Sequence, residues 1–421
     1  AGALRQTATD MGWLTSSLKE WSPEWSNAVF TLQERDLRWG RVRTLMAKAG
    51  IDAIVCFPLT HQHGRSAADA RYLTQLGENS DEVTCVFPLE GDVTAWSSRG
   101  GVWPASNWFT DIRSAERGFG GRTVSEYLRE HPKLLKGTIA IAGLTSTPIS
   151  HIRSAEGVVN WQSYETLRKN CPDATFVSAT PVLGEARWAK SAEEIEFLRK
   201  GIHVAELSLQ ALRENARAGV SERELYGHMM FASAKAGGSF HPMVGWVSGP
   251  QERPFHRIEQ PTFRKLQHGD LVSVEVEGIW GGYHSQLDQT MAIGDAPPHM
   301  FEAMKIVWDV FDDVVAAMKP GVTIGELMDL ADRKNLMGGR AWAGLGMHGR
   351  GTGNDGPLLT RKEEPPEVRN VVLVEGCAFN VKPSAAYDKA PDFVRWGDSV
   401  VVTAKGGERL GTRPKELPVL T

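Results

Sequence analysis

Several segments in the second half of the chain carry side chains that can exchange protons or hold charge. The run VSVEVEG contains Glu275 and Glu277, and the next apolar run, YHSQLD, ends on Asp288. A glycine-rich turn, GMHGRGTGND, contains His348, and Lys382 follows an apolar run in FNVKPS. Groups of these types can move protons and neutralise an anion, so they predict acid and base catalysis.

A further histidine follows a Ser-Gly pair on a polar stretch. His256 stands seven residues beyond Gly249, at the end of the segment PQERPFH. A histidine with a pKa near neutrality is the ordinary general acid or base at pH 7. His256 is therefore a candidate acid or base, with His348 as a candidate second proton carrier, and the family resemblance described below is what implies that His256 is catalytic.

The aromatic residues include an unusual share of tryptophan, with 14 Trp against 6 Tyr. Trp246, Trp280 and Trp396 lie on predicted strands near the acids, although strand alternation lets only some of them face the same side. Arg350 and Arg395 are candidates for holding an anionic or phenolic group. Together these residues predict an aromatic-walled pocket for a small, flat substrate.

The elements that position these residues fall into two groups. The first half alternates helical segments with the strand-like runs IDAIVCF, EVTCVFPL and TIAIAGL, which predicts an α/β domain over residues 1–183. A helix then begins in SAEEIEFLRKG, where Ser191 and Glu194 have the spacing of a capping box. Helices before and between apolar strands predict an α+β domain over residues 184–421.

Composition excludes several classes of partner. The net charge of -4 and the sequence pI near 6.4 give no field that would gather nucleic acid. No run of eighteen apolar residues offers a membrane span, and the start of the chain lacks a signal-like segment, so we expect a cytoplasmic protein. The four cysteines are widely spaced and mostly lie in apolar runs, which predicts reduced core thiols.

Four segments, matched in order, resemble the family of creatinase, aminopeptidase P and prolidase. They are ARWAKSAEEIEFLRKG, GDLVSVEVEGIWGGYHSQLDQT, GMHGRG and VRWGDSVVVT, and the match in order spans most of residues 185–405. The first half resembles, more weakly, the smaller domain of the creatinase and prolidase branch. The resemblance implies a creatinase-like α/β domain over 1–183 and an α+β catalytic domain with the pita-bread fold over 184–421.

In the peptidases of this family five ligands hold two metal ions. The resemblance places these positions on Glu275, Gln286, His348, Lys382 and Gly397. Two retained groups out of five imply that no metal pair and no other cofactor is held, because paired divalent ions need several carboxylates. The ammonium of Lys382 is expected where a metal charge stood, paired with Glu275, either as a catalytic cation or as a structural ion pair.

A single metal ion at a different site is the alternative that the resemblance leaves open. One iron-using lyase of the family carries an Asp-x-Asp pair, and Glu275-Val276-Glu277 has two acids at the same spacing. The acids and histidine near the same strands are Glu277, His284, Asp288 and Asp355.

The resemblance also bears on function, because creatinase keeps the fold, lacks the metals and uses a histidine whose position matches His256. We expect a metal-independent lyase that cleaves a small aromatic molecule, for instance by retro-aldol cleavage of a lignin-derived phenylpropanoid. The alternatives are a creatinase-like hydrolase of a C–N bond in a small non-peptide substrate and a binding module without catalysis. A peptidase is the least expected class.

The same resemblance implies a homodimer with shared sites. In the creatinase branch the small domain of one subunit reaches the other subunit's site. The segment THQHGRS is rich in polar groups. We therefore expect His61, His63 and Arg65 to contribute to the partner's site.

Overall fold

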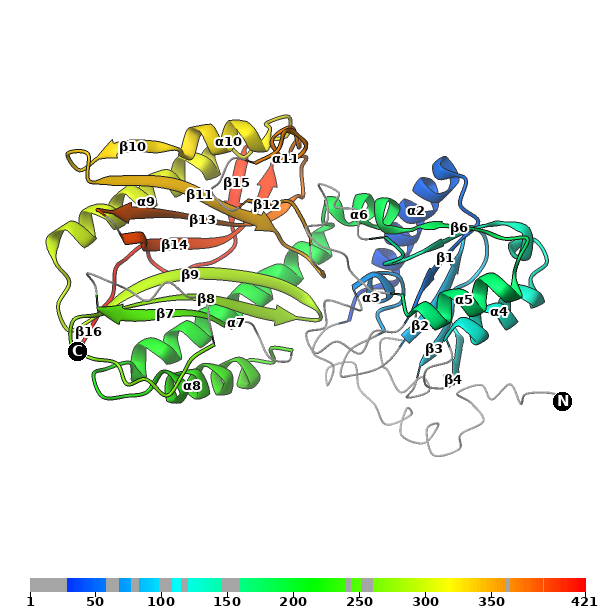
Figure 1. Cartoon of the computed structure of the whole chain (residues 1–421), viewed down its shortest axis with the longest axis horizontal. Coiled ribbons are helices and arrows are strands. Elements are labelled where there is room, and N and C mark those ends of the chain that lie inside the picture. Colours follow the sequence, from blue (N-terminus) through cyan, green and yellow to red (C-terminus); the bar gives the residue numbers. More distant parts are fainter. Residues whose placement is uncertain are drawn as a thin grey trace. The chain divides into compact units, whose positions relative to one another are not determined.

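The computed structural model describes residues 29–57, 68–76, 83–97, 108–114, 120–145, 159–239, 244–250, 260–353, 355–359, 364–388 and 390–421 (Figure 1). The chain divides into two compact units, which separate between Trp188 and Ala189. The predicted boundary at 183/184 falls inside α6 (Thr180–Trp188), which packs on α2 (Leu32–Ala49). Arg41 of α2 donates from Nη1 to the carbonyl oxygen of Ala186 at 2.9 Å. The division therefore follows the end of α6.

The first unit is built on a six-stranded sheet in the order β4-β3-β2-β1-β5-β6. The β1–β2 and β2–β3 pairs are antiparallel, and the β3–β4, β1–β5 and β5–β6 pairs are parallel. The remaining elements of this unit are α3 (Ala68–Thr74), α4 (Gly120–Glu130), η5 (Leu134–Lys136) and α5 (Trp161–Asn170). Its strands are β1 (Ala53–Cys56), β2 (Val83–Pro88), β3 (Thr94–Ser97), β4 (Asp111–Ser114), β5 (Thr138–Ile141) and β6 (Thr175–Ser178).

The apolar runs of the first half form buried strands, as their composition predicts. Every residue of β1 and β2 is buried, and α4 and α5 pack against each other (Figure 1). All four cysteines of the chain are buried, and none of them forms a disulfide bond with another described residue, which confirms the prediction of core thiols. Among the described helices, none is long and apolar enough to cross a membrane.

The second unit is built on a ten-stranded sheet whose main path runs β10-β11-β13-β14-β9-β8-β7. The strands on this path pair antiparallel. They are β7 (Val244–Pro250), β8 (Asp270–Trp280), β9 (Tyr283–Ile293), β10 (Arg333–Leu336), β11 (Ala341–Gly349), β13 (Ala378–Tyr387) and β14 (Ala390–Thr403). Short strands β12 (Leu358–Leu359), β15 (Gly406–Arg409) and β16 (Val419–Leu420) pair with β11, β14 and β9.

Helices pack on one face of this sheet. The helix α7 (Ala192–Asn215) begins at the predicted capping box of Ser191 and Glu194 and packs on β8 and β9. A Cβ on Gly278 would lie 1.9 Å from the carbonyl oxygen of Gly201, so these two glycines let α7 approach β8 closely. The other helices are α8 (Glu222–Lys235), α9 (Pro298–Ala317), α10 (Ile324–Ala331) and α11 (Pro366–Arg369), of which α9 packs on β13 and β14.

The pairing of β9 with β14 differs from that of the other long strands. Two residue pairs are in register, Gln289 with Trp396 and Asp288 with Gly397. On one side of them the hydroxyl of Thr290 bonds both the amide nitrogen and the carbonyl oxygen of Arg395, at 2.9 and 3.0 Å. On the other side the hydroxyl of Ser399 bonds both backbone groups of Gln286, at 3.0 and 3.1 Å. Side-chain hydroxyls therefore replace part of the main-chain ladder in this β9–β14 seam.

Candidate active site

The chemistry-bearing residues of the second unit share one face of its sheet. Glu275 of β8 lies opposite Asp288 of β9, and Glu277 lies opposite Gln286. Because side chains alternate along a strand, these four residues point to the same side, away from the face where Gly278 meets α7. We call this side the site face.

The strands across the seam bring further groups to the site face. On β14, Gly397 is the partner of Asp288, so Arg395, two residues earlier, has the same orientation. On β13, Asn380 lies between Ser399 of β14 and His348 of β11. Lys382 follows Asn380 by two residues and shares its side of the sheet.

Glu275 is held between two cations. Its Oε2 lies 3.1 Å from Lys382 Nζ, and its Oε1 lies 2.8 Å from Arg395 Nη1. Burial alone would raise the pKa of Glu275, but the charges of Lys382 and Arg395 outweigh it and lower the pKa to about 2. The predicted pairing of Glu275 with Lys382 is confirmed, and Arg395, expected at the substrate, is a second partner of the same carboxylate.

Asp288 has the opposite electrostatic balance. It is fully buried, and burial together with the charge of Glu275 raises its pKa above the ordinary value despite the nearby cation of Lys382. Its Oδ2 accepts from Asn380 Nδ2 at 2.9 Å and from Gln286 Nε2 at 3.4 Å. A carboxyl whose pKa is raised in this way is a candidate to take up or release a proton during catalysis.

His348 belongs to a second cluster on the site face. Arg350 Nη1 donates to Glu277 Oε1 at 2.8 Å, and Nη2 lies 3.4 Å from His348 Nε2. An arginine can only donate, so this contact makes Nε2 an acceptor and places the ring proton on Nδ1, 3.3 Å from the carbonyl oxygen of Gly349. His284 Nδ1 lies 3.7 Å from Glu277 Oε2. Arg350 therefore forms an ion pair with Glu277 and orients His348.

Asp355 is engaged elsewhere. Its Oδ2 forms a buried ion pair with Lys190 Nζ at 2.9 Å, both side chains being 2% exposed. A Cβ on Gly351 would meet this carboxylate at 1.9 Å, so the glycine makes room for the pair. The pair ties the turn after His348 to the start of the second unit.

The three tryptophans expected to wall a pocket lie away from the site face. Trp246 is paired with Val274, and Trp280 occupies the same side of β8, where Lys200 of α7 lies 5.4 Å from its ring. Trp396 is fully buried against Phe311 of α9, with ring centroids 4.9 Å apart. Strand alternation puts each of them one residue out of phase with the acids, so the structure does not bring them to the cluster.

Four predicted site residues lie outside the described residues: His61, His63, Arg65 and His256. The structure adds Asn380, which sequence reasoning did not single out. Asn380 precedes Lys382 by two residues on a strand, so alternation was the signal that would have found it.

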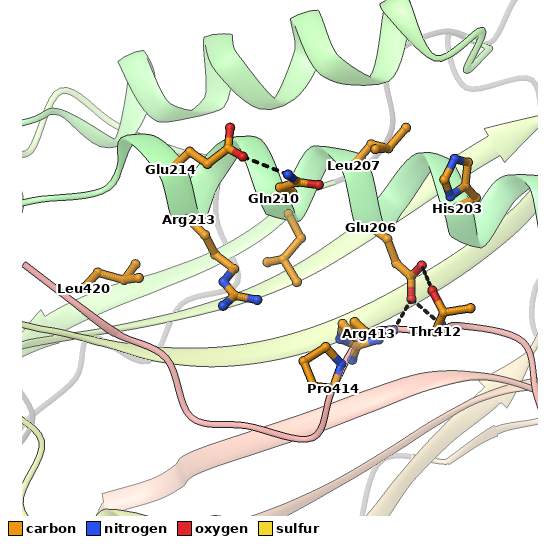
Figure 2. A pocket seen from close by; sticks show the side chains of 11 residues that line it. His203, Glu206, Leu207, Gln210, Arg213, Glu214, Thr412, Arg413, Pro414 and Leu420 are labelled. Carbon is orange, nitrogen blue, oxygen red and sulfur yellow. Dashed lines mark hydrogen bonds between the residues drawn. The ribbon is translucent and has the colours of Figure 1, made fainter.

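Arg413 supports the seam from the helix side. Its Nη2 donates to the carbonyl oxygen of Asp288 at 2.9 Å and to that of Gly397, and its Nη1 lies 2.8 Å from Asp398. Figure 2 shows Arg413 beside Thr412 at a groove of about 670 Å³ between α7 and the C-terminal segment. Glu206 of α7 accepts from the backbone nitrogen of Arg413 at 2.8 Å. This groove therefore lies behind the sheet, on the opposite side from the cluster.

Residues 196–404 match the model of metallopeptidase family M24. The matched residues make up most of the second unit of this chain. The Xaa-Pro dipeptidase of Pyrococcus furiosus is 24% identical over 62% of this chain and 74% of its own length. The uncharacterized peptidase YqhT of Bacillus subtilis is 25% identical over 90% and 99%. The probable dipeptidase PepE of Mycobacterium tuberculosis is 31% identical over 58% and 64%.

Solved structures share the M24 fold along nearly the whole chain. The Xaa-Pro dipeptidase of Bacillus anthracis has a TM-score of 0.70 at 21% identity and covers 92% of this chain and all of its own. The X-Pro aminopeptidase of Thermotoga maritima has a TM-score of 0.70 at 19% identity, covering 91% and 99%. The predicted fold class, an α/β N-terminal domain followed by an α+β pita-bread domain, is confirmed.

These relatives overturn the expected reaction. M24 proteins that align with this chain are named as dipeptidases, which cleave C–N bonds, and the lyase expectation is wrong. The same names oppose the view that a peptidase is the least expected class. The expectation of an aromatic substrate relied on an aromatic wall, and the three tryptophans lie away from the cluster.

The M24 family name implies a metal centre, and the residues present do not fit a metal pair. At the five positions, both oxygens of Glu275 are taken by cations, Gln286 is a neutral amide and Gly397 has no side chain. Lys382 places an ammonium beside the one carboxylate of the set. Divalent ions need several uncommitted carboxylates, so no chemical step is assigned to a metal here.

A single metal ion near Glu277, His284, Asp288 and Asp355 was the alternative expectation. Among the described residues, no group of three or more His, Cys, Asp or Glu side chains is placed to hold a metal. Glu277 is paired with Arg350, and Asp355 is paired with Lys190. Cations of the chain itself therefore pair with two of the three carboxylates named for such an ion, Glu277 and Asp355.

A carboxylate at position 397 has no room in this sheet. A Cβ there would lie 2.6 Å from Lys382 Cβ and 2.7 Å from the carbonyl oxygen of Val381. We expect Gly397→Ala to lower the free energy of unfolding by about 1–3 kcal/mol, a typical cost of overpacking, in urea titrations. Gly227→Ala, in α8 with nothing within 4 Å, is the control and should be neutral or stabilising. Equal effects of the two changes would contradict the steric argument.

Proposed function

We propose that this protein hydrolyses a C–N bond of amide or amidine type in a small molecule. The family relationship supports hydrolysis, because the aligned relatives are named as dipeptidases and peptidases. The observation that carries the proposal is that two carboxyl groups face each other on β8 and β9 with pKa values shifted in opposite directions. Asp288 has a raised pKa, and Glu275 opposite it is kept ionised by two cations.

The reaction needs a base, a stabiliser of negative charge and an acid. In the proposed step Asp288 takes a proton from water as the water oxygen bonds to the substrate carbon. The hydrogens of Lys382 and Arg395 stabilise the charge that develops on the substrate oxygen or nitrogen. The C–N bond then breaks as the leaving nitrogen receives the proton that Asp288 took from water, which returns Asp288 to its starting state. The cations are already positioned by Glu275, so little reorganisation is needed during the reaction.

Heavy-oxygen water tests the reaction type. We would incubate the purified chain with Xaa-Pro dipeptides, other dipeptides and small amidines, and follow amine or ammonia release by mass spectrometry. Hydrolysis places the heavy oxygen in the acyl or amide product, and Asp288→Asn should abolish that incorporation. Bond cleavage without incorporation of the label, or the absence of any cleavage across the panel, would contradict the proposal.

His256 keeps its predicted role as an acid or base on the strength of its position after Ser248-Gly249. We expect His256→Ala to reduce kcat by about 10²-fold or more, a typical loss when a general acid or base is removed. The effect should be measured on the substrate identified above, with unfolding curves to show that the variant is folded. A folded variant with unchanged kcat would remove His256 from the mechanism.

We also propose that the active unit is a homodimer to which the segment THQHGRS contributes in trans. Sedimentation equilibrium should give about twice the 46.3 kDa chain mass. Mixing an inactive His256→Ala protein with an inactive His61→Ala protein should restore part of the activity, because mixed dimers contain one intact composite site. A fully active monomer would contradict this proposal.

A further inference from the structure

The residues of the proposed hydrolysis lie on both sides of the β9–β14 seam. Asp288 lies on β9, whereas Arg395 lies on β14 and Lys382 on the neighbouring strand β13. In the seam, side-chain hydroxyls replace part of the main-chain ladder. A displacement of about 1 Å within a catalytic arrangement can lower the rate about 10²-fold. The rate therefore depends on what fixes the spacing of these two strands.

Arg413 joins the two strands at the position of Asp288 itself. Its Nη2 donates to the carbonyl oxygen of Asp288 at 2.9 Å and to the carbonyl oxygen of Gly397. These two residues are paired in register across the seam. Because the guanidinium is charged, both hydrogen bonds are of the stronger, charge-assisted kind. One nitrogen atom therefore holds the main chain of β9 to the main chain of β14 beside the proposed base.

The guanidinium group of Arg413 is itself held on several sides. Its Nη1 donates to Asp398 Oδ2 at 2.8 Å, and its central carbon lies 4.3 Å from the centroid of the Trp396 ring. The backbone nitrogen of Arg413 donates to Glu206 of α7 at 2.8 Å (Figure 2). The side chain is 6% exposed. A planar group held in this way has little freedom, so its Nη2 is a fixed point for both carbonyl groups.

Arg409 shares the surroundings of Arg413 but not its contact with β9. Its Nε donates to Asp398 Oδ2 at 2.7 Å, and its central carbon lies 4.7 Å from the centroid of the Trp396 ring. Its Nη2 donates to the carbonyl oxygen of Arg413 at 2.5 Å. Within the described part of the chain, the hydrogen bonds of this side chain do not reach β9. The two arginines therefore allow the contact with Asp398 to be separated from the contact with β9.

We propose that Arg413 is a positioning residue, which fixes Asp288 relative to Arg395 and Lys382 from the helix side of the sheet. This inference rests on the proposed function, because Asp288 is the base of that reaction. Arg413 bonds the backbone of Asp288 from behind the sheet and does not reach the site face. Its loss should therefore lower the rate of turnover far more than the affinity for substrate.

The experiment replaces each arginine by lysine. Lysine keeps the positive charge, but a single ammonium group does not reproduce the planar fork of hydrogen bonds. Arg413→Lys should lower kcat about 10-fold or more and change KM by less than about 3-fold. Arg409→Lys is the matched control, since it alters the same aspartate and the same ring. Its kcat should stay within about 2-fold of the wild type, even where its unfolding midpoint falls as far.

A second readout needs no substrate. The amide nitrogen of Gln289 belongs to the same peptide group as the carbonyl oxygen of Asp288, which Arg413 bonds. Relaxation-dispersion NMR on the full-length chain would detect motion of this peptide group on the microsecond to millisecond timescale. We expect such exchange at Gln289 in Arg413→Lys, and we expect none in the wild type or in Arg409→Lys.

Glu206→Ala keeps the buried guanidinium and loosens the segment that carries it. Glu206 is partly buried, and it also accepts from the backbone nitrogen and the hydroxyl of Thr412, at 2.5 and 2.9 Å. Its removal should lower kcat about 3-fold and give exchange at Gln289. Glu214→Ala is the control on the same helix, because its carboxylate accepts from Gln210 and should leave both readouts unchanged. This pair of variants decides where Arg413→Lys does not fold.

Several outcomes would overturn the inference. They are wild-type kcat in a folded Arg413→Lys, a loss of kcat without exchange at Gln289, or equal losses of kcat in the two lysine variants. If Arg413→Lys does not fold, wild-type behaviour of Glu206→Ala in both readouts has the same meaning. Exchange at Gln289 in Arg413→Lys, together with no cleavage of any compound by the wild type, would refute the proposed function alone. Wild-type cleavage rates in Arg413→Lys would refute this inference alone.

Discussion

Replacing Glu275 by glutamine is expected to lower the free energy of unfolding by about 3–5 kcal/mol, the typical cost of removing one member of a buried ion pair. Glu275 is 5% exposed and forms ion pairs with Lys382 at 3.1 Å and with Arg395 at 2.8 Å. The substitution therefore leaves two cations without their shared carboxylate. Urea unfolding at neutral pH measures the loss. Glu302→Gln, on the exposed side of α9, is the control and should have a far smaller effect.

A double substitution separates the structural role of Lys382 from its catalytic role. Lys382→Met alone should cost less than Glu275→Gln, because Glu275 keeps Arg395 and Lys382 is partly exposed. Adding Lys382→Met to Glu275→Gln should recover part of the stability, since one unpaired cation is gone. If activity returns with the stability, Lys382 is a structural residue, and the proposed stabilisation of negative charge loses its main support.

The same carboxylate gives a stability that depends on pH. Glu275 has its pKa lowered from 4.5 to about 2 in the folded chain, so it binds protons less readily when folded than when unfolded. Its contribution is present above about pH 4.5 and is lost as the pH falls towards 2, in total roughly 3 kcal/mol. Glu275→Gln should flatten the unfolding free energy in this window. An unchanged acid dependence would show that other carboxylates set it.

Asp288→Asn is expected to reduce kcat by about 10²–10⁴-fold, the range for a general acid or base. The variant should nevertheless be at least as stable as the wild type at pH 7. A carboxyl whose folded pKa is raised contributes stability at low pH that is lost as the pH rises, and an amide avoids that loss. Kinetics and urea unfolding on the same preparation measure the two effects.

Asp295→Asn provides the control for Asp288→Asn, because its side chain is 94% exposed on a turn after β9. It should leave both kcat and stability near the wild-type values. Loss of stability in Asp288→Asn together with loss of activity would instead assign Asp288 to the fold. A variant with normal kcat would show that another group accepts the proton.

Local patterns predicted most of the fold correctly. The capping box at Ser191 placed the start of α7, and the apolar runs of the first half became buried strands. The pairing of Lys382 with Glu275 also followed from the order of the matched segments. These features depend on residues that are close in sequence or on a family pattern, which a single sequence records.

The tryptophans show where sequence reasoning reached its limit. Their number suggested an aromatic pocket. Successive side chains on a strand point to opposite faces of the sheet, so a shift of one position decides which face a side chain occupies. Trp396 is adjacent to Arg395, and the two lie on opposite faces. The expected aromatic substrate depended on these side chains. The second cation on Glu275 and the amides of Gln286 and Asn380 at Asp288 required knowledge of which strands are neighbours.

The β9–β14 seam has a consequence for motion. The amides of Gln286 and Arg395 are hydrogen-bonded to the rotatable hydroxyls of Ser399 and Thr290, not to carbonyl groups of the facing strand. A hydroxyl can turn away without moving the backbone, so both amides should exchange with deuterium faster than those in the β8–β9 ladder. The seam separates Asp288 from Arg395 and Lys382. Opening of these hydroxyl contacts is therefore expected to loosen β9 from β14 beside the cluster before the β8–β9 ladder opens.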